Sequence, residues 1–408
     1  MVETENKAVL FWLSGIGLSS IHPIMEVETL MRQGFTAELA STPITGNQSH
    51  YYQVMTGRRP ECFGFFDTLM PHEYSVEEKP GGRDRPPETL ITLLSSAGWN
   101  VNYNEIAPAN LESSICAWAK TASAFSCLIV KCAYTEPLIG NMTTDLAQAI
   151  RIARTVVGEH GLFAIFSDAQ PILVKQFVNL NNFLASTGII DRNGPGNSID
   201  WSNSLAYYMG HGQLYVNLLG RDAKGIIKRQ QEYDEVCNIL VEVLPRKLRD
   251  PQTDQPVIAN VSRKEDFYSS DYLFCAPDLV VTFHPGYIPS PRSIYLDFDE
   301  TIFTTPPTGT AAINGAHPDS INGFLIASTP AFKRGVTFTA SMPLTAIAPT
   351  LLHALQVKHA LMDSDPQQEC FDPRYLYTHP LHTTTRSQEL SGEEEELILS
   401  RLRDLGYI

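Results

Sequence analysis

The stretch Val9-Leu10-Phe11-Trp12-Leu13 is continuously apolar, and Ser14-Gly15-Ile16-Gly17 follows it directly. A run that is apolar at every position fits a strand buried on both faces, which is typical of the centre of a parallel sheet. The serine and the two glycines predict a turn at the carboxyl end of this strand. Functional side chains collect at that edge of an open α/β sheet, so the turn marks where a site is expected.

Four further stretches repeat this apolar pattern along the chain. They are Cys127–Lys131, Gly161–Phe166, Leu214–Leu218 and Asp278–Phe283. Helical patterns lie between the apolar runs, including Asp145–Val157 and Glu232–Val243. Strands that alternate with helices predict an α/β fold, with a large, doubly wound and mostly parallel sheet that carries helices on both faces.

Changes in composition predict how the chain is organised. Residues 1–362 are expected to form one α/β domain, with a charged surface loop at 79–87 and a Thr- and Pro-rich flap at 292–315. From residue 363 the sequence turns polar and predicts a C-terminal tail, 363–408, in which Ser391–Leu405 forms a short amphipathic helix. Glu393–Glu396 lie in the first turn of that helix, where the helix dipole favours anions.

The charge balance excludes several classes of partner. The 408 residues include 30 Lys and Arg against 45 Asp and Glu, a net charge of −15. Such a protein repels phosphate backbones and anionic lipid, so we expect a small-molecule ligand or substrate, and neither nucleic acid nor membrane. No apolar run reaches the roughly 18 residues of a membrane span. Acidic residues precede the first apolar stretch, and the seven cysteines lack CxxC spacing, which favours a cytoplasmic protein.

A series of motifs runs in order along nearly the whole chain. They are Thr56-Gly57-Arg58-Arg59-Pro60, Phe166-Ser167-Asp168, Asn179–Leu184, Asp200-Trp201-Ser202, Tyr215–Arg221, Ala276–Val281, Pro285-Gly286-Tyr287 and Ala348-Pro349-Thr350-Leu351. This series resembles the alkaline phosphatase superfamily, and more specifically its type I phosphodiesterase/nucleotide pyrophosphatase branch. The resemblance implies the alkaline phosphatase-like fold. It also implies hydrolysis of phosphate esters by a Thr or Ser nucleophile and two metals, usually zinc.

The resemblance places the nucleophile nine residues before Thr56, where this chain has Asn47. An amide is not a nucleophile. A two-residue insertion in the preceding loop would place Thr45 there instead. Asn47 and Thr45 therefore both stand as candidate catalytic residues.

The metal ligands implied by the resemblance are largely missing. A two-zinc centre needs about six carboxylate and imidazole donors, because each zinc takes about four ligands. Ser14 stands where the family has its first Asp. Asn141 stands where it has a His, and Glu136 is the only carboxylate in the segment that begins at Tyr134.

Two implied ligands are retained. The segment Ser167-Asp168-Ala169-Gln170 keeps the Asp and loses the neighbouring His, and His317 matches the late His of the family. In the family these two residues belong to different metals. One donor per metal holds zinc poorly, so we expect no metal cofactor, with Asp168 and His317 as remnants.

Three hypotheses for function follow. The first is a metal-independent enzyme that acts on a small molecule in the strand-end pocket, for example in a specialised biosynthetic step. Imidazoles are its candidate acid–base groups. The residues expected to be catalytic are Asn47, Thr45, His211 and His317. The residues expected to line the pocket are Ser14, His50, Tyr134, Glu136, Asn141, Asp168 and His284.

The second hypothesis is an ordinary phosphodiesterase that depends on zinc or manganese. Its nucleophile would be Thr45, and its ligands would include Glu136, Asp168 and His317. The third is a catalytically silent protein that binds a ligand or a partner. Metal content and hydrolysis of a phosphodiester distinguish the second hypothesis from the other two.

Overall fold

The computed structural model describes most of the chain. The described ranges are 6–40, 47–64, 69–72, 75–78, 88–134, 141–193, 198–228, 230–268, 272–290, 301–312, 316–317, 321–359 and 362–381. The loop expected at 79–87 and the helix expected at Ser391–Leu405 lie outside these ranges.

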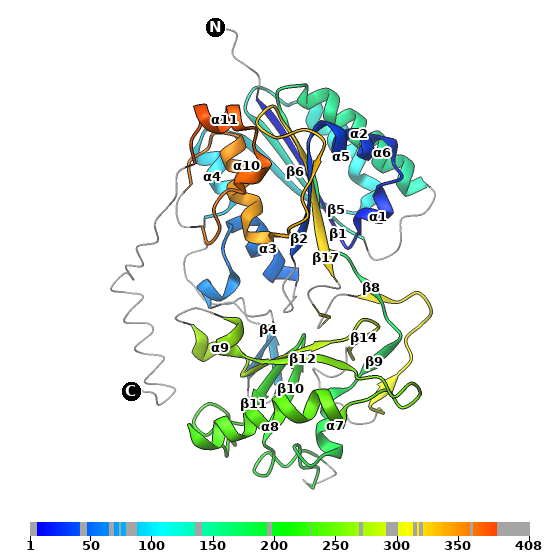
Figure 1. Cartoon of the computed structure of the whole chain (residues 1–408), viewed down its shortest axis with the longest axis vertical. Helices are drawn as coiled ribbons and strands as arrows, with labels where there is room; N and C mark the ends of the chain where they lie inside the picture. Colours follow the sequence, from blue (N-terminus) through cyan, green and yellow to red (C-terminus); the bar gives the residue numbers. More distant parts are fainter. Residues whose placement is uncertain are drawn as a thin grey trace, which may run out of the picture.

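An eight-stranded sheet forms the upper half of the molecule in Figure 1. Its main path runs in the order β18-β2-β17-β7-β1-β6-β5, and β19 also pairs with β2. These strands are β1 (Lys7–Ser14), β2 (Phe35–Ala40), β5 (Asn100–Ile106), β6 (Ser126–Ala133), β7 (Leu162–Ala169), β17 (Asn322–Ser328), β18 (Val336–Thr337) and β19 (Met342–Pro343). All pairings are parallel except those of β17 with β2 and β7. The predicted fold class is therefore confirmed.

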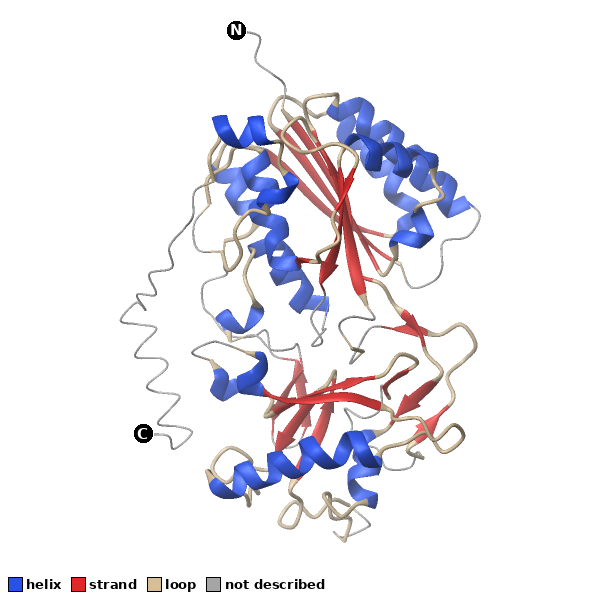
Figure 2. Cartoon of the chain, viewed as in Figure 1, coloured by secondary structure: helices blue, strands red, loops and turns tan. Residues whose placement is uncertain are grey.

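Helices cover both faces of this sheet (Figure 2). One face carries α1 (Leu18–Ile21), α2 (Met25–Gln33), α5 (Leu111–Ala119) and α6 (Asn141–Val157). The other carries α3 (Asn47–Thr56), α4 (Leu90–Ser96), α10 (Ile347–Ala354) and α11 (Pro373–Thr378). Leu10 and Trp12 of β1 belong to the core on the second face, whereas Phe11 and Leu13 belong to the core on the first. Burial on both faces explains why β1 is apolar throughout.

A second sheet, in the lower half of Figure 1, is antiparallel. Its strands, in spatial order, are β10 (Ala206–Gly210), β11 (Gln213–Val216), β13 (Leu279–Phe283) and β12 (Ile258–Arg263). The helices α7 (Leu180–Ser186), α8 (Gln231–Lys247) and α9 (Lys264–Phe267) belong to this half. The stretches Leu214–Leu218 and Asp278–Phe283 thus contribute to an antiparallel sheet and not to the parallel sheet we expected. Every residue of β11 and β13 is buried, and an apolar run alone does not distinguish the two environments.

Three small sheets complete the described strands. They are formed by β8 (Ile172–Leu173) with β16 (Ala311–Ala312), by β9 (Gln176–Val178) with β14 (Tyr287–Pro289) and β15 (Phe303–Thr304), and by β3 (Leu69–His72) with β4 (Ser75–Glu78). The described part of the expected flap, 301–312, contributes β15 and β16 to two of these sheets.

The hydrophobic core around the second sheet, called the second core below, is formed by the chain segment between β7 and β17. These two strands are neighbours in the large sheet. The chain leaves after β7 and returns at β17, and these two strands pair with each other. At the exit and return points, the Gln170 backbone N–H donates to the Ile321 carbonyl over 3.0 Å. The segment 170–321 is therefore an excursion whose two ends are adjacent. The single domain expected over 1–362 stays a prediction, and in the structure its described residues build more than one hydrophobic core.

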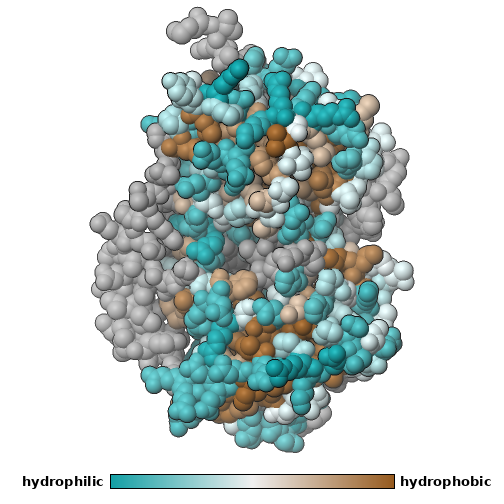
Figure 3. All heavy atoms as spheres, in the orientation of Figure 1, coloured by the Kyte–Doolittle hydropathy of each residue, from teal (hydrophilic) through white to brown (hydrophobic). Residues whose placement is uncertain are grey.

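The outer surface is mixed in character. Figure 3 shows hydrophilic residues spread over one face, with hydrophobic patches between them. Ile239 and Leu219 are among the exposed large apolar side chains, at 52% and 54% relative exposure. Among the helices that the structure describes, none is long and apolar enough to cross a bilayer.

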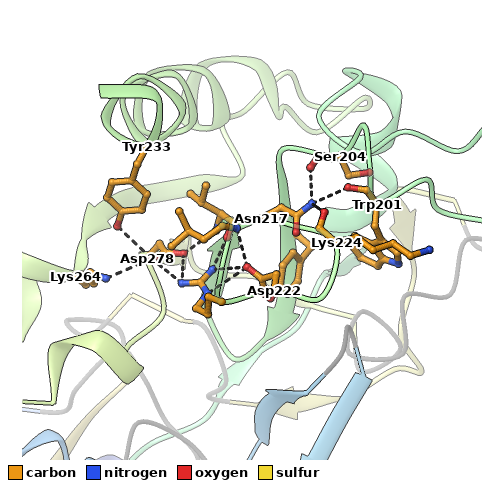
Figure 4. A network of polar contacts seen from close by, with 12 residues as sticks. Trp201, Ser204, Asn217, Asp222, Lys224, Tyr233, Lys264 and Asp278 are labelled. Atoms are coloured by element: carbon orange, nitrogen blue, oxygen red, sulfur yellow. Dashed lines mark hydrogen bonds and ion pairs between the residues drawn. The ribbon is translucent and has the colours of Figure 1, made fainter. Parts of the chain in front are cut away.

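Several motif residues of the second core form one buried polar network (Figure 4). The carboxylate of Asp278 is fully buried and lies 2.9 Å from the Arg221 guanidinium. It also accepts hydrogen bonds from the Val216 N–H at 2.8 Å, Tyr233 at 3.2 Å and Lys264 at 3.4 Å. Each charge is paired, as buried charges require.

Asn217 completes the network. Its side-chain amide donates to the carbonyls of Trp201, Ser204 and Lys224 at 2.8, 2.9 and 3.3 Å (Figure 4). One amide thus contacts two carbonyls of the loop before β10 and one carbonyl of the loop after β11. These motif residues hold the second core together, which accounts for their presence without assigning them chemistry.

Candidate active site

The carboxyl ends of β6, β1 and β7 lie side by side. Ser14 of β1 pairs with Ala133 of β6, and Trp12 pairs with Phe166 of β7. Continuing the second pairing by two residues places Ser14 beside Asp168. Because side chains alternate along a strand, Trp12 and Ser14 point to the same face of the sheet, the face that α3 covers.

Gly15 allows β1 to end tightly against Tyr134. The Tyr134 N–H donates to the Ser14 carbonyl at 2.8 Å. Gly15 has φ = +83°, and a Cβ added to it would lie 2.3 Å from the Tyr134 carbonyl oxygen. Any side chain here would be strained and would also clash with backbone. The glycine of the opening motif is therefore required by this junction of strand ends.

Asp168 stands at the centre of the strand-end cluster. Its side chain is almost completely buried. Oδ1 accepts a hydrogen bond from Trp12 Nε1 at 2.8 Å, and Oδ2 lies 2.7 Å from His50 Nδ1. Ser14 also hydrogen-bonds to this carboxyl group. Both oxygens of the carboxylate are thus engaged by protein donors.

The surroundings of Asp168 favour its ionised form. Burial raises the pKa of this carboxyl group, but the hydrogen bond and charge of His50 and the hydrogen bonds from Trp12 and Ser14 outweigh it, and the pKa lies below its usual value. A carboxylate only accepts hydrogen bonds, so Nδ1 of His50 is the donor in this contact. In the neutral imidazole with this tautomer, Nε2 carries the lone pair.

His50 enters the cluster from the first turns of α3. This helix begins at Asn47, and His50 is fully buried. The next residue, Tyr51, stacks on Trp12 with ring centroids 6.1 Å apart and planes at 14°. Both neighbours in α3 therefore contact the Trp12–Asp168 pair, and the helix is fixed to the sheet at this point.

A lysine supports the indole ring that binds Asp168. Nζ of Lys131, on β6, lies 5.0 Å from the Trp12 ring centroid. The same ammonium pairs with Glu105 of β5 at 2.9 Å. Cations over indole faces are attracted by the ring quadrupole, so Lys131 helps to hold Trp12 in the orientation that directs Nε1 to Asp168.

The other predicted residues near these strand ends have varied positions. Tyr134 is buried, and burial raises the pKa of its hydroxyl group. Asn47 and Asn141 are the first residues of α3 and α6, and their side chains are outside the described part. Thr45 and Glu136 also lie outside the described residues.

Three predicted histidines belong to the second sheet. His211 has φ = +49° in the turn that joins β10 to β11. His284 follows β13, and the N–H of His317 donates to the carbonyl of Phe283 in β13 at 3.2 Å. His284 and His317 therefore flank one strand end. Of the four predicted histidines, His50 has a described contact with Asp168.

The described donors do not assemble the zinc centre that the family resemblance of the sequence implies. Within the described ranges, no group of three or more His, Cys, Asp or Glu side chains converges to hold a metal ion. The retained carboxylate, Asp168, faces an indole N–H and an imidazole N–H. We therefore derive no chemical step through a metal from these residues.

Trp12 is a partner of Asp168 that was not predicted from the sequence. A signal was present, because Trp12 and Ser14 are two residues apart in a predicted strand and so share a face. The sequence assigned His50 to the pocket, and it favoured His211 and His317 as the catalytic histidines. The pairing of His50 with Asp168 joins residues 118 positions apart, and it depends on where α3 packs.

Comparison with known proteins gives a fold. No family model and no curated protein sequence matches the chain. Among the solved structures that are similar, three each share 12% identity with this chain and are covered over 100% of their own length. Murine ectonucleotide pyrophosphatase/phosphodiesterase 5, as an inactive variant in complex with AMP, gives a TM-score of 0.58 over 93% of this chain. A second structure of the murine protein gives 0.58 over 90%, and the human protein 0.55 over 93%. The chain has the fold of the ectonucleotide pyrophosphatases/phosphodiesterases.

Proposed function

We propose that this chain is an alkaline phosphatase-superfamily protein of the phosphodiesterase/nucleotide pyrophosphatase branch that works without the two-metal centre. In this proposal, His50 and Asp168 carry out acid–base chemistry on a small molecule at the strand ends. The order of the sequence motifs and the likeness in fold support the branch. The buried contact between His50 and Asp168 supports the change in chemistry.

The 2.7 Å contact between Nδ1 and Oδ2 is the observation that carries the proposal. A carboxylate that accepts a hydrogen bond from Nδ1–H fixes the imidazole tautomer and stabilises the imidazolium that forms when Nε2 takes up a proton. Trp12 holds the other carboxylate oxygen and so fixes the direction of the pair. A fixed tautomer and a fixed orientation are requirements for a general base.

The step that such a pair supports is proton removal from a hydroxyl group or a water molecule. Nε2 of His50 takes the proton, the oxygen attacks an electrophilic centre of the substrate, and the imidazolium returns the proton to the leaving group. Atoms and charge balance within this sequence without a metal. The reaction class is therefore transfer or hydrolysis of a group on a small molecule.

A metal-dependent phosphodiesterase is the second candidate, because the solved structures of similar fold carry that name. Metal stoichiometry separates the two. Protein purified without chelator is analysed by mass spectrometry, before and after incubation with excess zinc or manganese. We expect essentially no tightly held metal and no metal-stimulated hydrolysis of a chromogenic phosphodiester. Two metals per chain would reject the proposal and favour Thr45 as nucleophile.

A purely structural pair is the remaining alternative, and the titration of His50 distinguishes it. The C2 proton of His50 is followed by NMR as a function of pH, in the presence and absence of candidate substrates that give turnover. We expect the midpoint of this titration to match the midpoint of the pH–rate profile. H50Q should lower kcat by about 100-fold or more, whereas H317Q should leave the pH midpoint unchanged. A rate that does not respond to H50Q contradicts the assignment.

A further inference from the structure

A small polar cavity lies near the start of β7, at the end of the large sheet opposite the candidate active site. It has a volume of about 220 Å³. Its walls come from the ends of α2 and α6, the start of β7 and the end of β17, and include Phe163 and Ser328. Phe163 and Asp168 are five residues apart on β7, or about 17 Å at 3.3 Å per residue. The cavity is thus separate from the site at the carboxyl ends of the strands.

Two arginines make the lining of this cavity basic. Arg154 in the last turn of α6 and Arg334 after β17 both line it. Within the described ranges, neither forms an ion pair with a carboxylate, although the chain carries a net charge of −15. Other arginines in the same region are paired, such as Arg151 with Glu26 at 3.0 Å.

Arg154 is only partly satisfied. Its Nη2 donates to the side-chain oxygen of Gln33, whereas Nη1 is shielded from solvent and has no hydrogen-bond partner among the described residues. Burial lowers the pKa of this guanidinium. A buried donor without an acceptor costs free energy, and an anion in the cavity would remove that cost.

The other lining residues and the volume of the cavity are suited to a small oxyanion. Ser328, Thr329, Gly158 and Gly161 complete the lining, and the Ser328 hydroxyl donates to the Gln33 carbonyl at 3.3 Å. The one carboxylate in the lining is Glu159, an exposed residue. At about 220 Å³ the space is below the range of drug-sized ligand sites. Guanidinium groups bind phosphate oxygens with two parallel hydrogen bonds.

We propose that this cavity is a binding site for a phosphate group, held by Arg154 and Arg334. The site is independent of the proposed function, because it lies at the other edge of the sheet. The C-terminal ends of α2 and α6 also point toward this region, so the two arginines offset the partial negative charge of those ends as well. Substitution of each arginine separates that structural role from binding.

The test is titration of the full-length protein with inorganic phosphate by isothermal calorimetry, at constant ionic strength against chloride. We expect one phosphate per chain, with affinity reduced about tenfold or more in R334A and in R154K. R151A is the matched control, since Arg151 lies on the same helix and is already paired. Its affinity for phosphate should equal that of the unsubstituted protein.

A loss of phosphate affinity in R334A is not expected to result from unfolding. Arg334 is exposed, so R334A should keep the thermal midpoint measured without phosphate. The proposal is overturned if phosphate does not bind, if R334A binds as tightly as the unsubstituted protein, or if R151A loses affinity equally. The last result would indicate nonspecific attraction of anions to basic residues.

Discussion

His50 Nδ1 and Asp168 Oδ2 lie 2.7 Å apart, although a helix supplies one group and the central sheet supplies the other. Both side chains are almost wholly buried, with relative exposures of 1% and 4%. The pair therefore has two structural effects. It fixes α3 to the sheet, and it keeps one imidazole in a defined tautomer.

Removal of one member of this pair should destabilise the fold strongly. We expect D168N and H50Q each to lower the free energy of unfolding by roughly 3–5 kcal/mol, because each leaves a buried partner uncompensated. The double variant should lose less than the sum of the two. Denaturant unfolding measures all three. As a control, R246A removes an exposed pair with Glu242 and should cost less than about 1 kcal/mol. Additive losses in the double variant would contradict a direct interaction.

The contribution of Asp168 to stability should depend on pH in one direction. Its pKa is depressed in the folded protein, so its contribution is fully present above its unfolded pKa of about 3.9. The contribution is lost as the pH falls through the lower folded value. The difference in unfolding free energy between unsubstituted protein and D168N should therefore be constant from about pH 7 to about pH 5 and shrink below about pH 4. A difference that grows on acidification would mean the folded pKa is raised.

W12F should test the hydrogen bond from the indole to Asp168 Oδ1. The ring remains aromatic, but Nε1 is lost, and a buried carboxylate oxygen loses its donor. We expect a loss of about 1–3 kcal/mol in unfolding free energy. The matched control is W118F, since Trp118 is also buried and its Nε1 has no partner among the described residues. If both variants lose the same stability, ring packing and not the hydrogen bond is responsible.

G15A should be far more harmful than G98A, although both glycines have φ near +85°. A Cβ at residue 98 meets nothing within 4 Å, whereas at residue 15 it would lie 2.3 Å from the Tyr134 carbonyl oxygen. G98A should cost about 1–2 kcal/mol from backbone strain alone. G15A adds a clash that forces β1 and β6 apart at the site, so thermal unfolding should shift much further. Equal shifts would show that the strand ends relax freely.

Much of the fold could be predicted from the sequence, because continuous apolar runs and intervening helical patterns mark the central strands directly. β1, β6 and β7 lie where those runs predicted them. The same signal placed Leu214–Leu218 and Asp278–Phe283 in the wrong sheet. Complete burial produces the same apolar pattern in an antiparallel sheet as in a parallel one.

The sequence predicted individual residues of the site but not the contacts between them. Asp168, Ser14 and His50 were all named from sequence. Ser14 and Asp168 follow apolar runs, and the family resemblance placed His50 in a loop near the strand ends, whereas the structure has it in α3. Their mutual hydrogen bonds were not predictable, because a 2.7 Å contact depends on the packing of α3 against β1 and β7. Trp12 lies in a continuously apolar run, so the sequence did not distinguish it from residues of the hydrophobic core.

The adjacency of Gln170 and Ile321 has a consequence for how the chain folds. Closing a disordered loop over the segment 170–321 before β7 and β17 could pair would cost roughly 4 kcal/mol in chain entropy. If the antiparallel sheet between them forms first, its own contacts bring the two ends to the 3.0 Å separation seen at Gln170 and Ile321. The β7–β17 contact then becomes local in space, although it is distant in sequence. The core formed by the inserted segment would thus bring together the two strands of the large sheet that this segment separates in sequence.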